Sequence, residues 1–283
     1  MEPIIYPHFD RVALSLGPIT IYWYGVMYML AFLFFLYVGK WRIKKYGHPH
    51  FTPKFFDDFL LYGILGVIIG GRLGNCLFYS PGFYLANPME VFKVWNGGMA
   101  FHGGVIGVLI AVYVYAKRYK CGFFEITDVC APLVPVGLLF GRIGNCINGE
   151  LWGRIATDKI PFLMIYPESG SMLPRYPSNI YEALGEGLLL TIIMWVYANK
   201  PRKVGQVSGV LLLGYGLIRF VLEYFREPDS FLFESGLKLG LSVGQWLELP
   251  MIIAGLVIFY LASKGKFGTA VVTTATKNQG KRI

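Results

Sequence analysis

Long apolar runs dominate the chain, with short polar stretches between them. An α-helix needs about 20 apolar residues to cross a bilayer, and seven runs approach or exceed that length. The pattern therefore predicts seven membrane-spanning helices. Their expected ranges are 19–39, 58–79, 99–116, 122–143, 179–198, 206–225 and 243–262.

Two segments outside these runs differ from the rest. Residues 144–178 are rich in Gly, Pro and polar side chains, which predicts a small cap over the outer helix ends. Residues 268–283 are rich in Thr, Ala and Lys without periodicity, and we expect a disordered cytoplasmic tail. Residues 1–267 then form one transmembrane domain, so the predicted fold is an all-α polytopic membrane protein with about seven helices.

Small residues recur four positions apart within the runs, a spacing that lets helix backbones approach closely in lipid. We expect these glycines to pack helices together. They are Gly66, Gly70 and Gly74, Gly103 and Gly107, Gly137 and Gly141, and Gly205 and Gly209.

Composition agrees with a bilayer as the solvent. Apolar residues make up 55% of the chain and charged residues 15%, with a mean hydropathy of +0.51. The net charge of +9 comes from short basic clusters between apolar runs. This placement indicates membrane topology and argues against nucleic-acid binding.

The basic clusters also predict orientation. Residues 40–57, 117–121, 199–205 and 263–283 hold sixteen of the 26 Lys and Arg residues, and the segments on the other side hold seven. Because positive charge favours the cytoplasmic side, we expect the N-terminus outside and the C-terminus in the cytoplasm. The N-terminus lacks a basic region and a small-residue cleavage site, so the first span should remain in the mature protein.

Cysteine spacing and other short motifs predict no metal and no cofactor. Cys76, Cys121, Cys130 and Cys146 have neither C-x-x-C spacing nor nearby histidines, which argues against a zinc site or a disulfide framework. No nucleotide-binding motif or redox pair accompanies them.

Ionisable residues inside the apolar runs need an explanation, because each costs about 2.5–3.5 kcal/mol near the bilayer centre. In the predicted orientation they gather toward the outer helix ends. Spacing places Arg142 and Asn145 on one helix face, and Tyr215, Arg219 and Glu223 on another. The ionisable set is Arg72, His102, Arg142, Glu182, Glu186, Arg219 and Glu223.

Two interpretations of these charges remain open. In the first, the charges pair across helices and only stabilise the bundle, which we favour for Glu182 and Glu186. In the second, three arginines outnumber the buried acids at their depth and bind an anion. We favour the second for the arginines, because a guanidinium matches a phosphate through two parallel hydrogen bonds.

His102 lies in a glycine-rich segment at the start of the third run. A lone histidine at a helix start often has a structural role. However, an unperturbed pKa near 6.5 also makes His102 the best candidate for a general base.

The segment 141–154, Gly-Arg-Ile-Gly-Asn-Cys-Ile-Asn-Gly-Glu-Leu-Trp-Gly-Arg, resembles the signature of prolipoprotein diacylglyceryl transferases. The similarity extends to residues 22–25, 70–72, 101–104, 175–178 and 214–226. It implies a transfer of the diacylglyceryl group of phosphatidylglycerol to the lipobox cysteine of a prolipoprotein signal peptide. The thioether forms in the periplasmic leaflet of the bacterial inner membrane, among membrane lipids, and glycerol phosphate is released.

The resemblance also implies roles for individual residues. Arg142 and Arg219 would hold the phosphate, and His102 would take the thiol proton, with Glu223 as the alternative base or as a partner that positions Arg219. The remaining residues would shape the site or bind substrate: Tyr24, Arg72, Asn145, Asn148, Glu150, Gly153, Arg154 and Tyr215.

Two other membrane functions are weighed against this one. A transporter or channel would also bury charges, but here the inner half is mostly apolar apart from Glu125 and Asp128. An intramembrane protease would need a serine in a Gly-x-Ser-x-Gly setting or a helix-embedded aspartate pair, and neither occurs.

Overall fold

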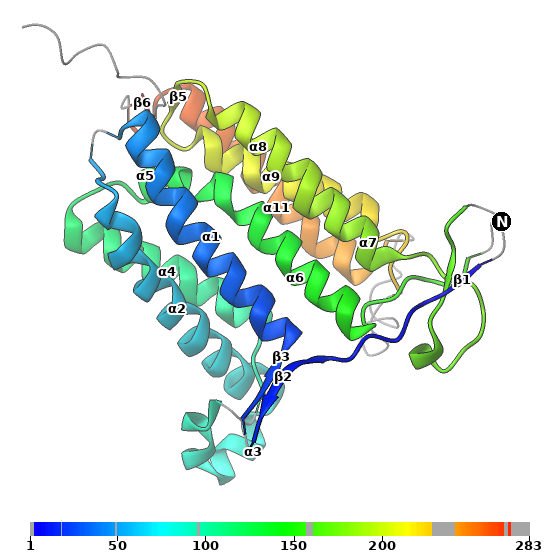
Figure 1. Ribbon diagram of the computed structural model, residues 1–283. Helices are drawn as coiled ribbons and strands as arrows, with labels where there is room; N and C mark the ends of the chain where they lie inside the picture. The colour runs from blue at the N-terminus through cyan, green and yellow to red at the C-terminus, as the bar shows by residue number, and fades with distance from the viewer. Residues whose placement is uncertain are drawn as a thin grey trace, which may run out of the picture.

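The structure is a computed structural model that describes residues 3–17, 19–48, 50–94, 97–156, 161–227, 241–268 and 271–272. Helices form most of it and run side by side in one bundle (Figure 1). A helix or helical rod lies at each of the seven predicted spans. These are α1 (Trp23–Tyr46), α2 (Lys54–Gly74), α4 (Phe101–Tyr119), α5 (Phe123–Cys130) with α6 (Val134–Asn148), α7 (Ser178–Glu182) with α8 (Leu190–Ala198), α9 (Gln206–Leu222) and α11 (Val243–Ser263).

Three short segments extend or join these helices. A π-helical turn, Asn75–Tyr79, continues α2, and another, Ala183–Leu189, joins α7 to α8. The 3-10 segment Ala131–Leu133 joins α5 to α6. Among the described residues, five helices or rods are long and apolar enough to cross a bilayer, while α9 is apolar but shorter. The all-α polytopic membrane fold is thereby confirmed, and the count of seven crossings stays a prediction.

The first span begins later than predicted. Residues 19–22, expected to be helical, form strand β3 (Ile19–Tyr22), which pairs antiparallel with β2 (Val12–Leu16). The run Ile-Thr-Ile is β-branched and favours extended backbone, so α1 starts only at Trp23.

Two further strand pairs join segments distant in sequence. β1 (Ile4–Ile5) pairs in parallel with β4 (Met164–Ile165), and β5 (Arg202–Lys203) pairs antiparallel with β6 (Val271–Val272). Residues 269–270 and 273–283 of the predicted tail lie outside the described residues.

Glycines bring α2 and α4 into backbone contact. A Cβ added at Gly70 would clash with the Gly103 carbonyl oxygen, and one at Gly66 would lie 2.7 Å from that of Gly107. The predicted packing role is confirmed for these glycines, which allow an approach that larger residues prevent. It is wrong for Gly137 and Gly141, where an added Cβ would meet nothing within 4 Å.

A buried carboxylate fastens α5 to α9 at the end of the bundle opposite the N-terminal strands. Asp128, only 2% exposed, accepts hydrogen bonds from the backbone N–H groups of Gly205 (2.6 Å) and Ser208 (2.7 Å). These N–H groups lie at the start of α9, where no turn of helix precedes to accept their hydrogen bonds. Asp128 therefore caps α9 from a different helix.

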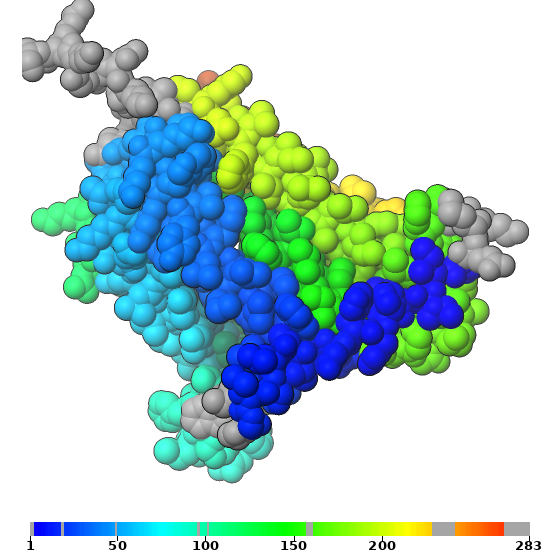
Figure 2. Space-filling view, viewed as in Figure 1, coloured from blue at the N-terminus to red at the C-terminus, as the bar shows by residue number. Residues whose placement is uncertain are grey.

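The opposite end of the bundle carries the N-terminal arm and a protruding segment that contains α3 (Pro81–Ala86) and the 3-10 turn Pro88–Phe92 (Figure 2). The ring of Tyr6 stacks on that of Tyr166 at 4.6 Å between centroids. Burial raises the pKa of the Tyr166 phenol, whose hydroxyl donates to Asn179 Oδ1. The arm is thus packed onto the loop between α6 and α7.

Candidate active site

Charged side chains from three neighbouring helical segments meet near the end of the bundle that carries the N-terminal arm. Arg142 lies near the end of α6, and Arg219 lies near the end of α9. Glu182 ends α7, and Glu186 follows in the π-helical turn. Both glutamates are fully buried, so these residues carry their charges away from solvent.

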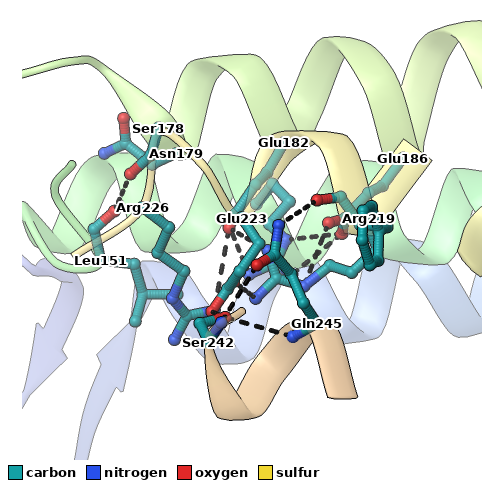
Figure 3. A network of polar contacts seen from close by, with 12 residues as sticks. Leu151, Ser178, Asn179, Glu182, Glu186, Arg219, Glu223, Arg226, Ser242 and Gln245 are labelled. Carbon is teal, nitrogen blue, oxygen red and sulfur yellow. Dashed lines mark hydrogen bonds and ion pairs between the residues drawn. The ribbon is translucent and has the colours of Figure 1, made fainter. Parts of the chain in front are cut away.

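The two glutamates bridge the two arginines. Arg142 Nη1 forms an ion pair with Glu182 Oε2 at 3.0 Å, and Arg219 Nη1 donates to Glu182 Oε1 at 3.0 Å. Glu186 Oε2 lies 2.9 Å from Arg142 Nη2, and its Oε1 lies 3.7 Å from Arg219 Nε. Two carboxylates thereby bridge the two guanidinium groups. Figure 3 labels Glu182, Glu186 and Arg219 of this arrangement.

Two more charges extend this network. Arg219 Nη2 lies 2.8 Å from Glu223 Oε2, one helical turn further along α9. Arg226 Nη1 lies 3.7 Å from Glu182 Oε1. We call these six residues the arginine–glutamate network: Arg142, Glu182, Glu186, Arg219, Glu223 and Arg226.

The network corrects one step of the sequence argument. We expected three buried arginines to outnumber the acids at their depth. Arg72, one of the three, donates to backbone carbonyls elsewhere, and the other two face three carboxylates. The pairing expected for Glu182 and Glu186 is confirmed, and it includes Arg142 and Arg219. An anion that binds here must therefore compete with carboxylates already in place.

The start of α11 holds Glu223 from the other side. Ser242 Oγ donates to Glu223 Oε1 at 3.0 Å and accepts from the backbone N–H of Gln245 (Figure 3). A Cβ on Gly244 would clash with Glu223 Oε1, so only glycine leaves room for the carboxylate. The α11 N-terminus thus fixes the orientation of Glu223.

Sequence reasoning missed several of these contacts, although signals for two of them existed. Ser242 and Gln245 form a capping box, a pattern recognisable from their spacing. Glu248 is an ionisable residue in the last apolar run. It interacts electrostatically with Arg219, Glu186 and Glu223, and its Oε2 is buried without a hydrogen-bond partner among the described residues. No sequence signal placed the Arg226 side chain against Glu182.

A neutral polar cluster adjoins the network at the end of α6. Asn145 Nδ2 donates to Glu150 Oε1 at 2.8 Å, and Asn148 Nδ2 donates to the same oxygen at 3.2 Å. Tyr24 packs from α1, and a Cβ on Gly144 would lie 2.7 Å from its ring. The structure therefore brings together four residues predicted to shape the site.

Gly153 and Arg154 dock the following loop onto the end of α9. The Arg154 backbone N–H donates to Phe225 O at 3.0 Å, and its Nε donates to Arg226 O at 2.8 Å. A Cβ on Gly153 would clash with Tyr176 O, so a larger residue would push the two backbone segments apart. Both residues position Arg226 rather than extend the charged network.

Tyr215, Arg72 and His102 occupy different surroundings. Tyr215 interacts electrostatically with Glu186, Arg219 and Arg142, so it borders the network. Arg72 donates to backbone carbonyls of residues 90–98, including Val91 O and Lys93 O at 3.0 Å each. Its hydrogen bonds hold the protruding segment.

His102 lies in the first turn of α4, the helix that packs along α2, and its side chain is exposed.

The described part of the chain contains no group of three or more His, Cys, Asp or Glu residues that could hold a metal ion. The network and its surroundings offer guanidinium groups, carboxylates, tyrosines and amides.

Comparison with known proteins agrees with the motifs. A family model described as prolipoprotein diacylglyceryl transferase matches residues 11–261. The phosphatidylglycerol–prolipoprotein diacylglyceryl transferase of Methylibium petroleiphilum is 53% identical over 263 residues, which cover 92% of this chain and 99% of that relative.

Two more relatives carry the same name. The protein from Polynucleobacter necessarius is 56% identical over 255 residues, covering 89% of this chain and 95% of the relative. The protein from Bordetella avium is 51% identical over 259 residues, covering 92% and 97%. Given this near-complete coverage and the matched motifs, the chain belongs to the prolipoprotein diacylglyceryl transferase family.

Proposed function

We propose that this protein transfers the diacylglyceryl group of phosphatidylglycerol to the lipobox cysteine of prolipoproteins, the first step of bacterial lipoprotein maturation. Family membership over residues 11–261 supports the activity. The observation that carries the site assignment is the pair of guanidinium groups, Arg142 and Arg219, held together inside the membrane bundle by Glu182 and Glu186.

The paired arginines suit the leaving group of this reaction. The cysteine sulfur forms a bond to the glycerol carbon while the bond from that carbon to the phosphate oxygen breaks, and the oxygen keeps the electron pair. Negative charge develops on the phosphate as this bond breaks. Guanidinium groups that are already in position stabilise that charge most in the transition state. The phosphate takes hydrogen bonds that Glu182 and Glu186 accept in the structure.

The thiol proton needs an acceptor, because the thiolate is the nucleophile. We assign this role to His102, with Glu223 as the alternative. The His102 side chain is exposed at the start of α4, where a substrate thiol can approach it. Glu223 is held by Arg219 and Ser242. The contacts of Glu223 support a role in positioning Arg219.

The neutral cluster is assigned to substrate binding. Tyr24, Asn145, Asn148 and Glu150 offer hydrogen bonds to the glycerol or to the peptide, and Tyr215 offers its hydroxyl at the network. Gly153 and Arg154 hold the loop above them. Arg72 acts on the substrate indirectly, by holding the protruding segment at the same end of the bundle.

The protein is a multi-pass membrane protein. We place it in the bacterial inner membrane with its N-terminus in the periplasm and its C-terminus in the cytoplasm. The distribution of Lys and Arg supports this orientation. The arginine–glutamate network then lies toward the periplasmic leaflet, where secreted precursors and phospholipid headgroups meet.

The test is a direct assay of the transfer. Purified protein in detergent is incubated with phosphatidylglycerol and a synthetic lipobox peptide, and mass spectrometry looks for the diacylglyceryl adduct on the peptide cysteine. We expect the adduct with the unaltered protein. Its absence under conditions in which another family member is active would reject the proposed function.

A matched pair of variants tests the site. Arg142→Lys keeps the charge but loses the two-pronged fork, so we expect a loss of turnover with the fold retained. Arg118→Lys makes the same change in the last turn of α4, outside the network, and should leave turnover unaltered. Equal turnover in both variants would show that the guanidinium fork of Arg142 does not hold the phosphate.

A further inference from the structure

A cavity of about 370 Å³ lies where α4 ends and α5 begins. Phe123, one of its lining residues, starts the rod that carries Arg142 nineteen positions later, so several helical turns separate the two. The cavity is therefore separate from the arginine–glutamate network. It is lined by Tyr113, Ala116, Lys117, Lys120, Cys121 and Phe123.

The lining combines two positive charges with no acidic group. Neither Lys117 nor Lys120 has an ion-pair partner in the part of the chain that the structure describes. The nearby acid, Glu125, is occupied elsewhere. It accepts from the Gly122 backbone N–H at 3.0 Å and lies 3.0 Å from His50 Nδ1. The lining itself thus carries two positive charges and no negative one, and Lys117 Nζ lies 5.6 Å from the centroid of the Tyr113 ring.

The backbone at Lys120 is unusual for a residue with a side chain. Lys120 ends α4 in the left-handed conformation, with φ of 53° and ψ of 40°. Glycine is the usual residue at this position because a Cβ is unfavourable there. Here a lysine occupies this position at the cavity rim. Its positive charge is therefore present although a side chain is unfavourable in the left-handed conformation.

An apolar face of α4 leads to the cavity. Ile106, Ile110 and Tyr113 are each more than half exposed, and their spacing places them on the same side of the helix as Lys117. In a membrane helix this face meets acyl chains. A ligand at the lysines therefore has an apolar path beside it, which suits a molecule with a charged head and a hydrocarbon tail.

We propose that this cavity binds the phosphate headgroup of an anionic phospholipid, from the leaflet that borders the C-terminal end of α4. In the proposed orientation this is the cytoplasmic leaflet. Basic pockets between membrane helices on this side recognise such headgroups, and the volume lies in the range of ligand sites. Lys117 and Lys120 contact the phosphate, and the acyl chains follow the α4 face. The site does not depend on the transferase activity.

The free thiol of Cys121 lines the cavity and reports its occupancy. Burial raises the pKa of this thiol, so labelling by a maleimide is followed at mildly alkaline pH. The full-length protein in detergent is labelled with phosphatidylserine, phosphatidylcholine or inorganic phosphate added, and peptide mass spectrometry reads the modification of Cys121. We expect phosphatidylserine to slow the labelling and the other two additions to leave it unaltered.

The double variant Lys117→Gln with Lys120→Gln removes the proposed contacts. Losing two lysines near the headgroup should weaken the protection by phosphatidylserine roughly thirtyfold. The control, Lys44→Gln with Lys45→Gln, removes two charges from the last turn of α1, outside the cavity, and should keep full protection.

Three outcomes would overturn the proposal. Equal protection by phosphatidylcholine would show that the headgroup charge has no role. Equal protection by inorganic phosphate would indicate a simple anion site. Protection that survives in the Lys117 and Lys120 double variant would place the lipid elsewhere.

Discussion

At the residue scale, the charged side chains near the outer helix ends neutralise one another. Helical spacing placed Arg142 with Asn145, and Arg219 with Glu223, on common faces, but spacing within one helix does not say which faces meet. The bridges from Glu182 and Glu186 to both arginines depend on the packing of α6, α7 and α9. Sequence could therefore name the arginines and glutamates of α6, α7 and α9, whereas their pairing and the parts of Arg226 and Ser242 could not be predicted.

His102→Gln tests the assignment of the general base. If His102 takes the thiol proton, turnover should fall by about 10²–10⁴, the usual contribution of general base catalysis, with little change in KM. His8→Gln, on the exposed N-terminal arm, is the control. Full turnover by His102→Gln would transfer the role to Glu223.

His48 should make the stability of the protein depend on pH. Burial lowers its pKa to about 4, and its Nδ1 accepts from the backbone N–H groups of His50 and Phe51 at 3.1 Å each. An unfolded histidine protonates near 6.5, so the unfolded state binds more protons between these values. The stabilising contribution is complete above about pH 6.5 and is lost as pH falls toward 4.

The variant His48→Asn keeps a hydrogen-bond acceptor but does not titrate. We expect a lower Tm near neutral pH, because packing against Phe51 is lost, and a smaller decrease in Tm on acidification. Thermal unfolding in detergent at several pH values measures both. A slope as steep as that of the unaltered protein would rule out His48 as the titrating group, and His8→Asn is the exposed control.

At the element scale, the glycine contacts between α2 and α4 can be tested with a matched pair. Gly70→Ala would drive a Cβ into Gly103 O, and overpacking of this kind costs about 1–3 kcal/mol. Gly63→Ala lies on the same helix, where an added Cβ meets nothing within 4 Å. We expect a lower Tm for the first variant and an unchanged or higher one for the second, since alanine favours helix.

The helices could be predicted from apolar runs because the signal extends over about 20 residues. Short elements have no comparable signal. The strand Ile19–Tyr22 is apolar like the helix that follows, and its β-branched residues favour extended backbone only weakly until they pair with Val12–Leu16. The π-helical turn at Ala183–Leu189 likewise depends on its packing against α6, where an added Cβ on Gly187 would clash with Leu139.

At the scale of the whole molecule, the proposed orientation can be measured with single exposed cysteines. Ser15 lies in strand β2 and Lys264 lies just after α11, and each is replaced by cysteine in a separate variant, Ser15→Cys and Lys264→Cys. A thiol reagent that cannot cross membranes should label the first in intact cells and the second only after permeabilisation, each compared with the unaltered protein. The reverse pattern would invert the topology and move the network to the cytoplasmic leaflet.

The cap that Asp128 places on α9 has a mechanical consequence. It joins the two halves of the chain at the end of the bundle remote from the arginine–glutamate network. Ion pairs from Arg219 to Glu182 and Glu223 hold α9 near its other end, so the helix is fastened at both ends. Because a helix rises by a fixed distance of about 1.5 Å per residue, the Asp128 cap also sets the depth in the bundle at which Arg219 meets Glu182 and Glu186.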